Sequence, residues 1–419
     1  MAYDVQDVRR QFPGLARERD GKPVAFLDNP AGTQVPLSVV DRMAAAMLHT
    51  NSNLGGYFDT SVEAGELVAK AHRAAATLVN ASETGEVFFG QNMTTLTFAM
   101  SRSIGSLLKE GDEIVLSRMD HDANVAPWLM LAEDKGLVVR WLDFSPETYE
   151  FDLADLKALM NERTRLVAVC YASNVTGTIN DIAAISAIAH EAGALVYVDA
   201  VQYAPHGLID VQALGCDFLV CSAYKFFGPH YGIFWGRREV LDRLRPYKVR
   251  AASNDLPWRF TTGTTNREQL AGVHAAIDYI AGLSRFDAGT AGTAGLREKL
   301  AAGFKVMKQH DDMLTQRLID GLKPFNRVRI LGITDPAAIG RRVSTVSFFV
   351  EEASSADLVK SWAADGLQVW SGHNYGLEAN RRLGILDLGS GIRVGPVHYN
   401  TAEEIDRVIG AVDRSLGGR

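Results

Sequence analysis

The chain contains 419 residues, of which 47% are hydrophobic and 22% charged, and its formal net charge is −7. Because acidic residues are in excess and Lys and Arg are scattered, a basic surface for nucleic acid is excluded. The N-terminal stretch MAYDVQDVRRQFPGL lacks the apolar core of a secretory signal, and no apolar run approaches the ~20 residues of a membrane span. Three cysteines are too few for a disulfide framework, so we expect a cytoplasmic protein without a membrane partner.

Residues 64–285 alternate helical periodicity with short apolar runs. Helical patterns cover 67–81, 94–108, 125–136 and 182–193, and apolar runs typical of strands cover 86–90, 112–117, 137–144, 165–173, 195–202 and 217–224. Strands this continuously apolar, separated by helices, are typical of a parallel sheet that is covered on both faces. The sequence therefore predicts an α/β domain with a mostly parallel, doubly wound sheet.

The pattern changes after about residue 290. A long helical stretch covers 289–322, and shorter strands and helices follow at 328–332, 342–351, 355–366, 367–370, 391–396 and 401–416. These strands alternate apolar with polar positions, which predicts a sheet with one open face. We expect an N-terminal segment, 1–25, that packs on a small α+β domain of residues 286–419, and a large domain of residues 26–285.

Polar residues follow five of the strands predicted for the large domain. Ligands of open parallel sheets bind outside the carboxyl ends of the strands, so these positions are the candidate site. They comprise Asn92, Met93 and Thr94, then His121, Asn174, Asp199 and Gln202, and finally Ser222, Tyr224 and Lys225. The first three residues stand where a helix begins, which is typical of a phosphate seat and equally of an ordinary N-cap.

Asp199 and Lys225 are charges at the ends of strands that the pattern predicts to be buried. A buried carboxylate needs a partner, and a protonated pyridine nitrogen would be one. A buried lysine is costly unless it is paired or neutralised, and an amine that forms a Schiff base with an aldehyde is one solution. Together the two residues indicate pyridoxal 5'-phosphate, while the alternative is a simple Asp199–Lys225 ion pair.

The motifs FLDNPAGTQVP, DHDANVAPW, SNVTGT, VDAVQ, SAYKFFGP and GIRVGPVHYNTAEEID resemble those of the class V aminotransferase and cysteine desulfurase-like family, pyridoxal-phosphate enzymes of fold type I. The resemblance runs nearly end to end. It implies an amino-acid substrate and a homodimer, because Thr264 resembles a residue that reaches the phosphate of the neighbouring subunit; the alternative for Thr264 is a turn residue. No metal site is expected.

The resemblance also implies roles for the candidate residues. His121 would stack on the cofactor ring, Asn174 and Gln202 would lie near its phenolic oxygen, and Asp199 would pair with its nitrogen. Asn92, Met93, Thr94, Ser222 and Tyr224 would surround the phosphate, and Arg393, with Asn174 and His373, would bind the substrate. Lys225, His121, Asp199 and Tyr375 are thus the expected catalytic residues.

Three places depart from the family pattern, and the first is the loop QNMTT, residues 91–95, which differs from the common Thr-Thr-Glu form. Tyr224 stands where a His is usual, and Tyr375 stands where desulfurases of this kind carry a nucleophilic Cys. A phenol cannot store sulfur as a persulfide, so a persulfide-forming desulfurase is disfavoured. From a quinonoid intermediate we expect a desulfurase-like lyase that eliminates at a C–S bond; the alternatives are an aminotransferase, an epimerase and, least favoured, a non-catalytic scaffold.

Overall fold

The computed structural model describes residues 3–290, 292 and 294–417. Within that part of the chain, a seven-stranded sheet has the order β4-β10-β9-β8-β7-β5-β6. Its strands are β4 (Val87–Gly90), β5 (Glu113–Ser117), β6 (Val138–Leu142), β7 (Thr164–Cys170), β8 (Leu195–Asp199), β9 (Phe218–Ser222) and β10 (Gly232–Gly236). The β6-β5-β7-β8-β9 series is parallel, whereas β10 runs antiparallel to both β9 and β4. The mostly parallel sheet and the fold class predicted from the sequence are confirmed.

Successive residues along strands of the large sheet pack into different hydrophobic clusters. In β4, Val87 and Phe89 belong to one cluster and Phe88 to the other, and Val115 of β5 is separated in the same way from Ile114. Side chains of a strand alternate between the two faces, so both faces of the sheet are buried. The helices around the sheet are α2 (Leu37–His49), α3 (Asp59–Val79), α4 (Met93–Gly105), α5 (Ala126–Lys135), α6 (Leu153–Leu159), α7 (Ile182–Glu191), α8 (Val211–Leu214), α9 (Arg238–Leu241) and α10 (Arg267–Gly282).

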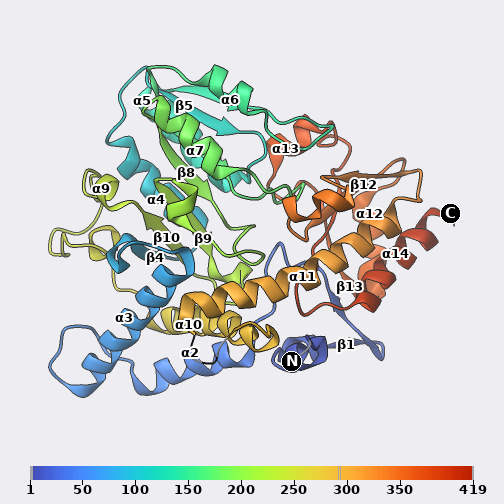
Figure 1. The fold of residues 1–419 in the computed structure, drawn as a ribbon, viewed down its shortest axis with the longest axis horizontal. Coiled ribbons are helices and arrows are strands. Elements are labelled where there is room, and N and C mark those ends of the chain that lie inside the picture. The colour runs from blue at the N-terminus through green and yellow to red at the C-terminus, as the bar shows by residue number, and fades with distance from the viewer. Residues whose placement is uncertain (1–2, 291, 293, 418–419) are drawn as a thin grey trace.

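Helix α11 (Leu296–Leu322) joins the two halves of the molecule (Figure 1). It packs against α10 and α3 at one end and against α14 (Ala402–Leu416) at the other. With 27 residues it is about 40 Å long, enough to cross a small domain. The sequence pattern placed the start of this helix at residue 289, whereas the helix begins at Leu296; residues 291 and 293 lie outside the described residues.

A second sheet, of order β11-β12-β15-β14, forms the C-terminal part. It contains β11 (Val328–Leu331), β12 (Val346–Val350), β14 (Trp370–Ser371) and β15 (Ile392–Val394), with α12 (Ser355–Ala364) and α13 (Leu377–Arg382) nearby. The prediction of one open face is wrong for β12, all five residues of which are buried. Phe348 packs toward α11 and α14, while Phe349 packs on the other side with Leu383 and Ile385 at the junction with the large sheet.

The N-terminal segment contains α1 (Val5–Arg9), β1 (Glu18–Arg19), β2 (Lys22–Pro23) and β3 (Ala25–Phe26). Strand β3 pairs in parallel with β13 (Leu367–Gln368), and Arg9 forms an ion pair of 3.0 Å with Glu404 of α14. Phe12 is 1% exposed and packs against Tyr279 and Tyr399. This segment therefore contacts both halves, and the domain limits given above remain a proposal.

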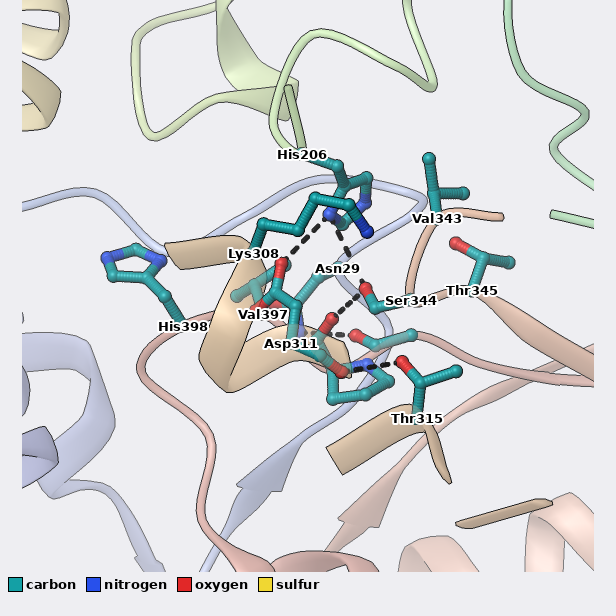
Figure 2. A network of polar contacts seen from close by, with 12 residues as sticks. Asn29, His206, Lys308, Asp311, Thr315, Val343, Ser344, Thr345, Val397 and His398 are labelled. Carbon is teal, nitrogen blue, oxygen red and sulfur yellow. Dashed lines mark hydrogen bonds and ion pairs between the residues drawn. The ribbon is translucent and has the colours of Figure 1, made fainter. Parts of the chain in front are cut away.

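A buried polar network links the chain after β8 to α11 and to the C-terminal part (Figure 2). Asp311 Oδ2 lies 3.1 Å from Nδ1 of His206, and the Ser344 hydroxyl lies 3.4 Å from the same nitrogen. Thr315 Oγ1 donates to the Asp311 carbonyl at 2.7 Å. Because buried polar groups are stable only when they are paired, the network fixes these three segments together.

Arg342 forms a second connection between the two halves. It is 1% exposed and donates to the carbonyls of Thr345, at 2.6 Å, and Thr176, at 3.4 Å. Gly177 lies against it with φ of +75°, and a Cβ there would come within 2.6 Å of the Thr345 carbonyl oxygen. Only glycine fits so close an approach, which brings the loop after β7 against the segment of residues 342–345 that leads into β12.

Candidate functional site

A pocket of about 410 Å³ opens beside the C-terminal ends of β5, β7, β8 and β9. This is where an open parallel sheet places its ligands, and the volume is typical of small-molecule sites. Of the residues predicted from the sequence, its wall contains Met93, Thr94, His121, Asn174, Asp199, Gln202, Tyr224, Lys225, His373, Tyr375 and Arg393.

Three predicted residues lie outside the pocket wall. The Asn92 side chain caps its own helix, since Oδ1 accepts from the Thr95 amide at 2.9 Å, which is the N-cap alternative stated above. Ser222 lies directly behind the wall, where its Oγ accepts from the Met93 amide at 2.9 Å. Thr264 is exposed and does not approach the other residues within this one chain.

Lys225 lies at the end of the short 3-10 helix Ala223–Lys225 that follows β9. Its Nζ donates to the carbonyls of Pro30, at 2.5 Å, and Ala31, at 3.1 Å. It also lies 4.9 Å from the centre of the Tyr224 ring. Burial, together with the nearby positive charge of Arg393, lowers the pKa of Lys225 to about 7, although the charge of Asp199 opposes the shift. The amine is therefore largely available as a nucleophile or base near neutral pH.

Asp199 is the last residue of β8 and is 4% exposed. Its Oδ1 accepts from the Val201 amide at 2.9 Å. Burial raises its pKa to about 6, partly opposed by that hydrogen bond and by the charge of Lys225. Within the described chain no cation lies within 4 Å of this carboxylate, so the alternative of an Asp199–Lys225 ion pair is not realised. The site thus holds a buried carboxylate that can receive an N–H donor from a ligand.

His121 and Tyr375 form an aromatic pair at the pocket wall. Their ring centres are 5.3 Å apart and the ring planes are inclined by 24°. The Nδ1 of His121 accepts from the Ala123 amide at 3.0 Å, which places any ring proton on the other nitrogen. Burial and the charges of Lys225 and Arg393 lower the pKa of His121 to about 3, so its ring is neutral.

Arg393, on β15, is 5% exposed, and its Nη1 donates to the Asn174 carbonyl at 3.2 Å. Neither Arg393 Nε nor Asn174 Oδ1 has a hydrogen-bond partner among the described residues. Burial lowers the pKa of Arg393 to about 10, which still leaves it charged at neutral pH, and Asp28 opposes that shift. A buried guanidinium with a free N–H is a carboxylate-binding group.

The sequence model of the aminotransferase class-V family matches residues 25–300 and 283–408. A curated relative, the cysteine desulfurase of Pectobacterium atrosepticum, is 32% identical over 429 residues, which cover 99% of this chain and 98% of the relative. That of Dickeya dadantii is 30% identical over 98% of this chain and 97% of the relative. The chain belongs to the aminotransferase class-V family.

Solved structures of class-V proteins superimpose on the whole chain. The apo cysteine desulfurase of Thermococcus onnurineus has a TM-score of 0.87 at 25% identity, with 100% of both chains covered. An Escherichia coli cysteine desulfurase, in an S-sulfonic acid form, has a TM-score of 0.84 at 25% identity and covers 100% of this chain and 99% of its own. The chain is accordingly a pyridoxal-phosphate-dependent enzyme, as the sequence predicted.

The residues present fit pyridoxal phosphate. One pocket is lined by an amine that can be neutral, from Lys225, a buried carboxylate, from Asp199, and an aromatic ring, from His121. Helix α4 begins at the pocket edge with Met93 and Thr94, and its positive end favours a phosphate there, although the Met93 and Thr95 amides already bond Ser222 and Asn92. The exact role of each residue toward the cofactor remains a proposal.

Sequence reasoning missed several residues of the pocket wall, notably Pro30, Ala31, Trp370 and Cys170. Pro30 and Ala31 belong to the FLDNPAGTQVP motif that carried the family resemblance, which was the available signal. Cys170 lies in the apolar run 165–173, which predicted a buried strand, and it is buried, but it also reaches the pocket wall. Burial raises the pKa of its thiol, so it is mostly protonated.

Proposed function

We propose that this enzyme is a lyase that breaks the Cβ–S bond of a cysteine derivative and releases the sulfur as a thiol. The observation that carries the proposal is the convergence of Lys225, Asp199 and Arg393 on one pocket, in whose described wall the single thiol, Cys170, has a raised pKa. The relatives named cysteine desulfurase support a substrate of the cysteine type. When bound, pyridoxal phosphate would supply an electron sink for the carbon from which a proton is removed.

Lys225 is the proposed base for the substrate's Cα proton. Its pKa of about 7 means that roughly half of the free amines are neutral at pH 7. Asp199 would hold the cofactor's ring nitrogen protonated, because a carboxylate buried in this way is stabilised by an adjacent N–H⁺. The neutral ring of His121 would cover the cofactor ring without adding charge.

Arg393 is the proposed anchor for the substrate carboxylate. The free Nε–H of its side chain and its burial favour a charge-assisted hydrogen bond to an anion. The unpaired Oδ1 of Asn174 is placed to accept from the substrate or from the cofactor. Binding at Arg393 would orient the Cα–H bond for transfer of its proton to Lys225.

The sulfur would leave the substrate's Cβ by elimination, without first being transferred to a cysteine of the enzyme. As the Cα proton passes to Lys225, the Cβ–S bond breaks with its electron pair moving to sulfur, and the Tyr375 hydroxyl supplies a proton to the thiolate. The three-carbon fragment then hydrolyses to pyruvate and ammonia. Cys170 is the single thiol among the described residues of the pocket wall, and its raised pKa disfavours nucleophilic attack on sulfur.

We further propose that the enzyme is a cytoplasmic homodimer in which Thr264 completes the neighbouring site. Thr264 is exposed, and exposed apolar side chains gather on α2 and on the segment leading into α3, namely Val40, Met47, Leu48, Tyr57 and Phe58. A contiguous set of this kind favours burial against another protein surface. The three cysteines are free and buried, as in a reducing compartment. No helix in the described part of the chain is long and apolar enough to cross a bilayer.

The proposal is tested with the protein loaded with pyridoxal phosphate, cysteine or S-methylcysteine, and a buffer without thiols. We expect pyruvate and free sulfide or methanethiol in equal amounts, with no requirement for a keto-acid acceptor and no product from Lys225→Ala. Catalytic formation of alanine with one sulfur atom bound to a cysteine would overturn the proposal in favour of a desulfurase, and Cys170→Ala identifies the carrier. Product formation only with a keto-acid acceptor would instead identify an aminotransferase.

A further inference from the structure

We infer that the substrate of this site carries an uncharged, bulky apolar or aromatic group on its sulfur, and that Trp370 and Tyr375 select it. The inference rests on the proposed function and names its substrate class. It follows from three features of the pocket: the charges that its wall provides, the position of Trp370, and the way in which Tyr375 is held.

The charges of the pocket wall are already assigned. Among the described residues of the wall, the charged side chains are Lys225, Arg393 and Asp199, and these serve the cofactor and the substrate carboxylate. The two histidines of the wall, His121 and His373, each use Nδ1 to accept a backbone N–H group at 3.0 Å. Among the described residues of the wall, no further Asp, Glu, Lys or Arg remains to pair with a charged substrate side chain, which would lose hydration without gaining an ion pair.

Trp370 stands beside the carboxylate anchor. In the antiparallel pair of β14 and β15 it is directly opposite Arg393, and opposite residues share one face of a sheet with Cβ atoms about 5 Å apart. Its side chain lies near Asp28, where it acts to lower the pKa of that carboxyl, while 51% of the residue remains exposed. A substrate held by Arg393 would therefore meet an apolar indole surface that has no cover in the described chain.

Tyr375 is held by a loop that is closed by hydrogen bonds. The Asp122 amide donates to the Tyr375 carbonyl at 2.7 Å, and Asn174 Nδ2 donates to the Asn374 carbonyl at 2.7 Å. Asn374 and Tyr375 have φ of 49° and 58°, a left-handed conformation that is unfavourable for a residue as bulky as Tyr.

This local strain sets the position of the Tyr375 ring. The ring lies against His121 with 64% of the residue exposed. Glycine would adopt this conformation without strain, and the residue that stands there instead places a ring on the pocket wall. The Trp370 and Tyr375 rings, both on this wall, thus offer apolar surface to the part of the substrate beyond Cβ.

The test compares S-benzylcysteine with S-methylcysteine, because their alkyl thiol leaving groups are similar and they differ mainly in the ring. We expect kcat/KM for thiol release to be roughly 10 to 100 times higher for S-benzylcysteine. S-carboxymethylcysteine and S-aminoethylcysteine, which carry an anion and a cation, should be poorer than S-methylcysteine. Equal values for the benzyl and methyl substrates, or a preference for a charged one, would overturn the inference and leave the lyase proposal standing.

Binding is measured separately with sulfur-free isosteres, 2-amino-5-phenylpentanoate and 2-aminopentanoate, as ligands of the loaded enzyme. If 2-amino-5-phenylpentanoate binds more tightly than 2-aminopentanoate but no cysteine conjugate releases a thiol, the inferred substrate class is supported and the lyase proposal is rejected. Trp370→Ala and Tyr375→Ala should each reduce the benzyl preference about tenfold, whereas Tyr375→Phe should retain it because the ring carries the contact. Leu388→Ala, which alters an exposed side chain away from the pocket wall, is the matched control. An unchanged preference in both alanine variants would also overturn the inference.

Discussion

The rate at which Lys225 reacts with an aldehyde can be tested directly by measuring it as a function of pH. Its pKa falls from an ordinary 10.5 to about 7. At pH 7 about one half of the Lys225 amines are then neutral, against roughly 1 in 3,000 for an ordinary lysine. We therefore expect this lysine to capture the cofactor's aldehyde about 10³ times faster at pH 7 than a surface lysine of equal access.

The pH profile distinguishes this amine from an ordinary one. For a pKa of about 7, the neutral fraction rises only about tenfold between pH 6 and pH 8 and flattens above, whereas an ordinary lysine rises about a hundredfold without a plateau. Removing the positive charge with Arg393→Met should raise the pKa of Lys225 and shift the plateau to higher pH. Asp199→Asn should shift it the other way, because the Asp199 charge raises the pKa of Lys225.

The assay mixes cofactor-free protein with pyridoxal phosphate and follows the absorbance of the covalent adduct in a stopped-flow instrument. Borohydride reduction and peptide mass spectrometry then locate the modified lysine. N-acetyl-lysine methyl amide, measured in parallel, corrects for the titration of the cofactor itself. A hundredfold rise between pH 6 and pH 8, or adduct formation on another lysine with Lys225→Ala behaving as wild type, would refute the reasoning.

Three further results are expected. Asp199→Asn should lower kcat at least about 10²-fold with little change in Tm, since it removes the carboxylate that keeps the ring nitrogen protonated but retains the shape; wild-type turnover would contradict this. Arg393→Lys should raise KM by about tenfold or more and change kcat less, because a lysine cannot reproduce the planar guanidinium contacts; an unchanged KM would remove Arg393 from carboxylate binding. Thr264→Ala should be inactive alone, but mixing and refolding it with Lys225→Ala should recover about one quarter of wild-type activity, since half of the dimers then contain one intact site. Absence of recovery, with heterodimers confirmed by native mass spectrometry, would contradict a shared site.

The large sheet could be predicted because its strands are nearly continuous apolar runs that helices separate. The same rule pointed to the polar residues at strand ends, and Asp199 and Lys225 do line one pocket. The rule failed for β12, which was expected to expose one face: Phe349 packs into the junction with the large sheet, and a sequence pattern does not show which surfaces meet in this way. Trp370 was missed for a similar reason.

Trp370 belongs to a two-residue strand, β14, too short to give a periodic signal. It joins the site because that strand pairs with β15, which brings it opposite Arg393. Asn92 shows the opposite limit, since a residue at a helix start suits both a phosphate ligand and an N-cap, and its side chain caps α4. Thr264 lies outside the pocket of one chain, so its assignment stays a prediction.

The buried links between the two halves determine how small molecules reach the pocket. Swinging the halves apart would separate the His206 ring from Asp311 and Ser344 and would break the bond from Arg342 to the Thr176 carbonyl, leaving buried polar groups unpaired. Small molecules should therefore enter and leave past Trp370 and Tyr375, the exposed aromatic residues of the pocket wall, while the two halves stay fixed relative to each other. Rotation of exposed side chains takes nanoseconds or less, whereas hinge closure takes microseconds to milliseconds. Product escape should then be fast relative to the bond-breaking step, so that replacing the Cα hydrogen with deuterium slows the overall turnover.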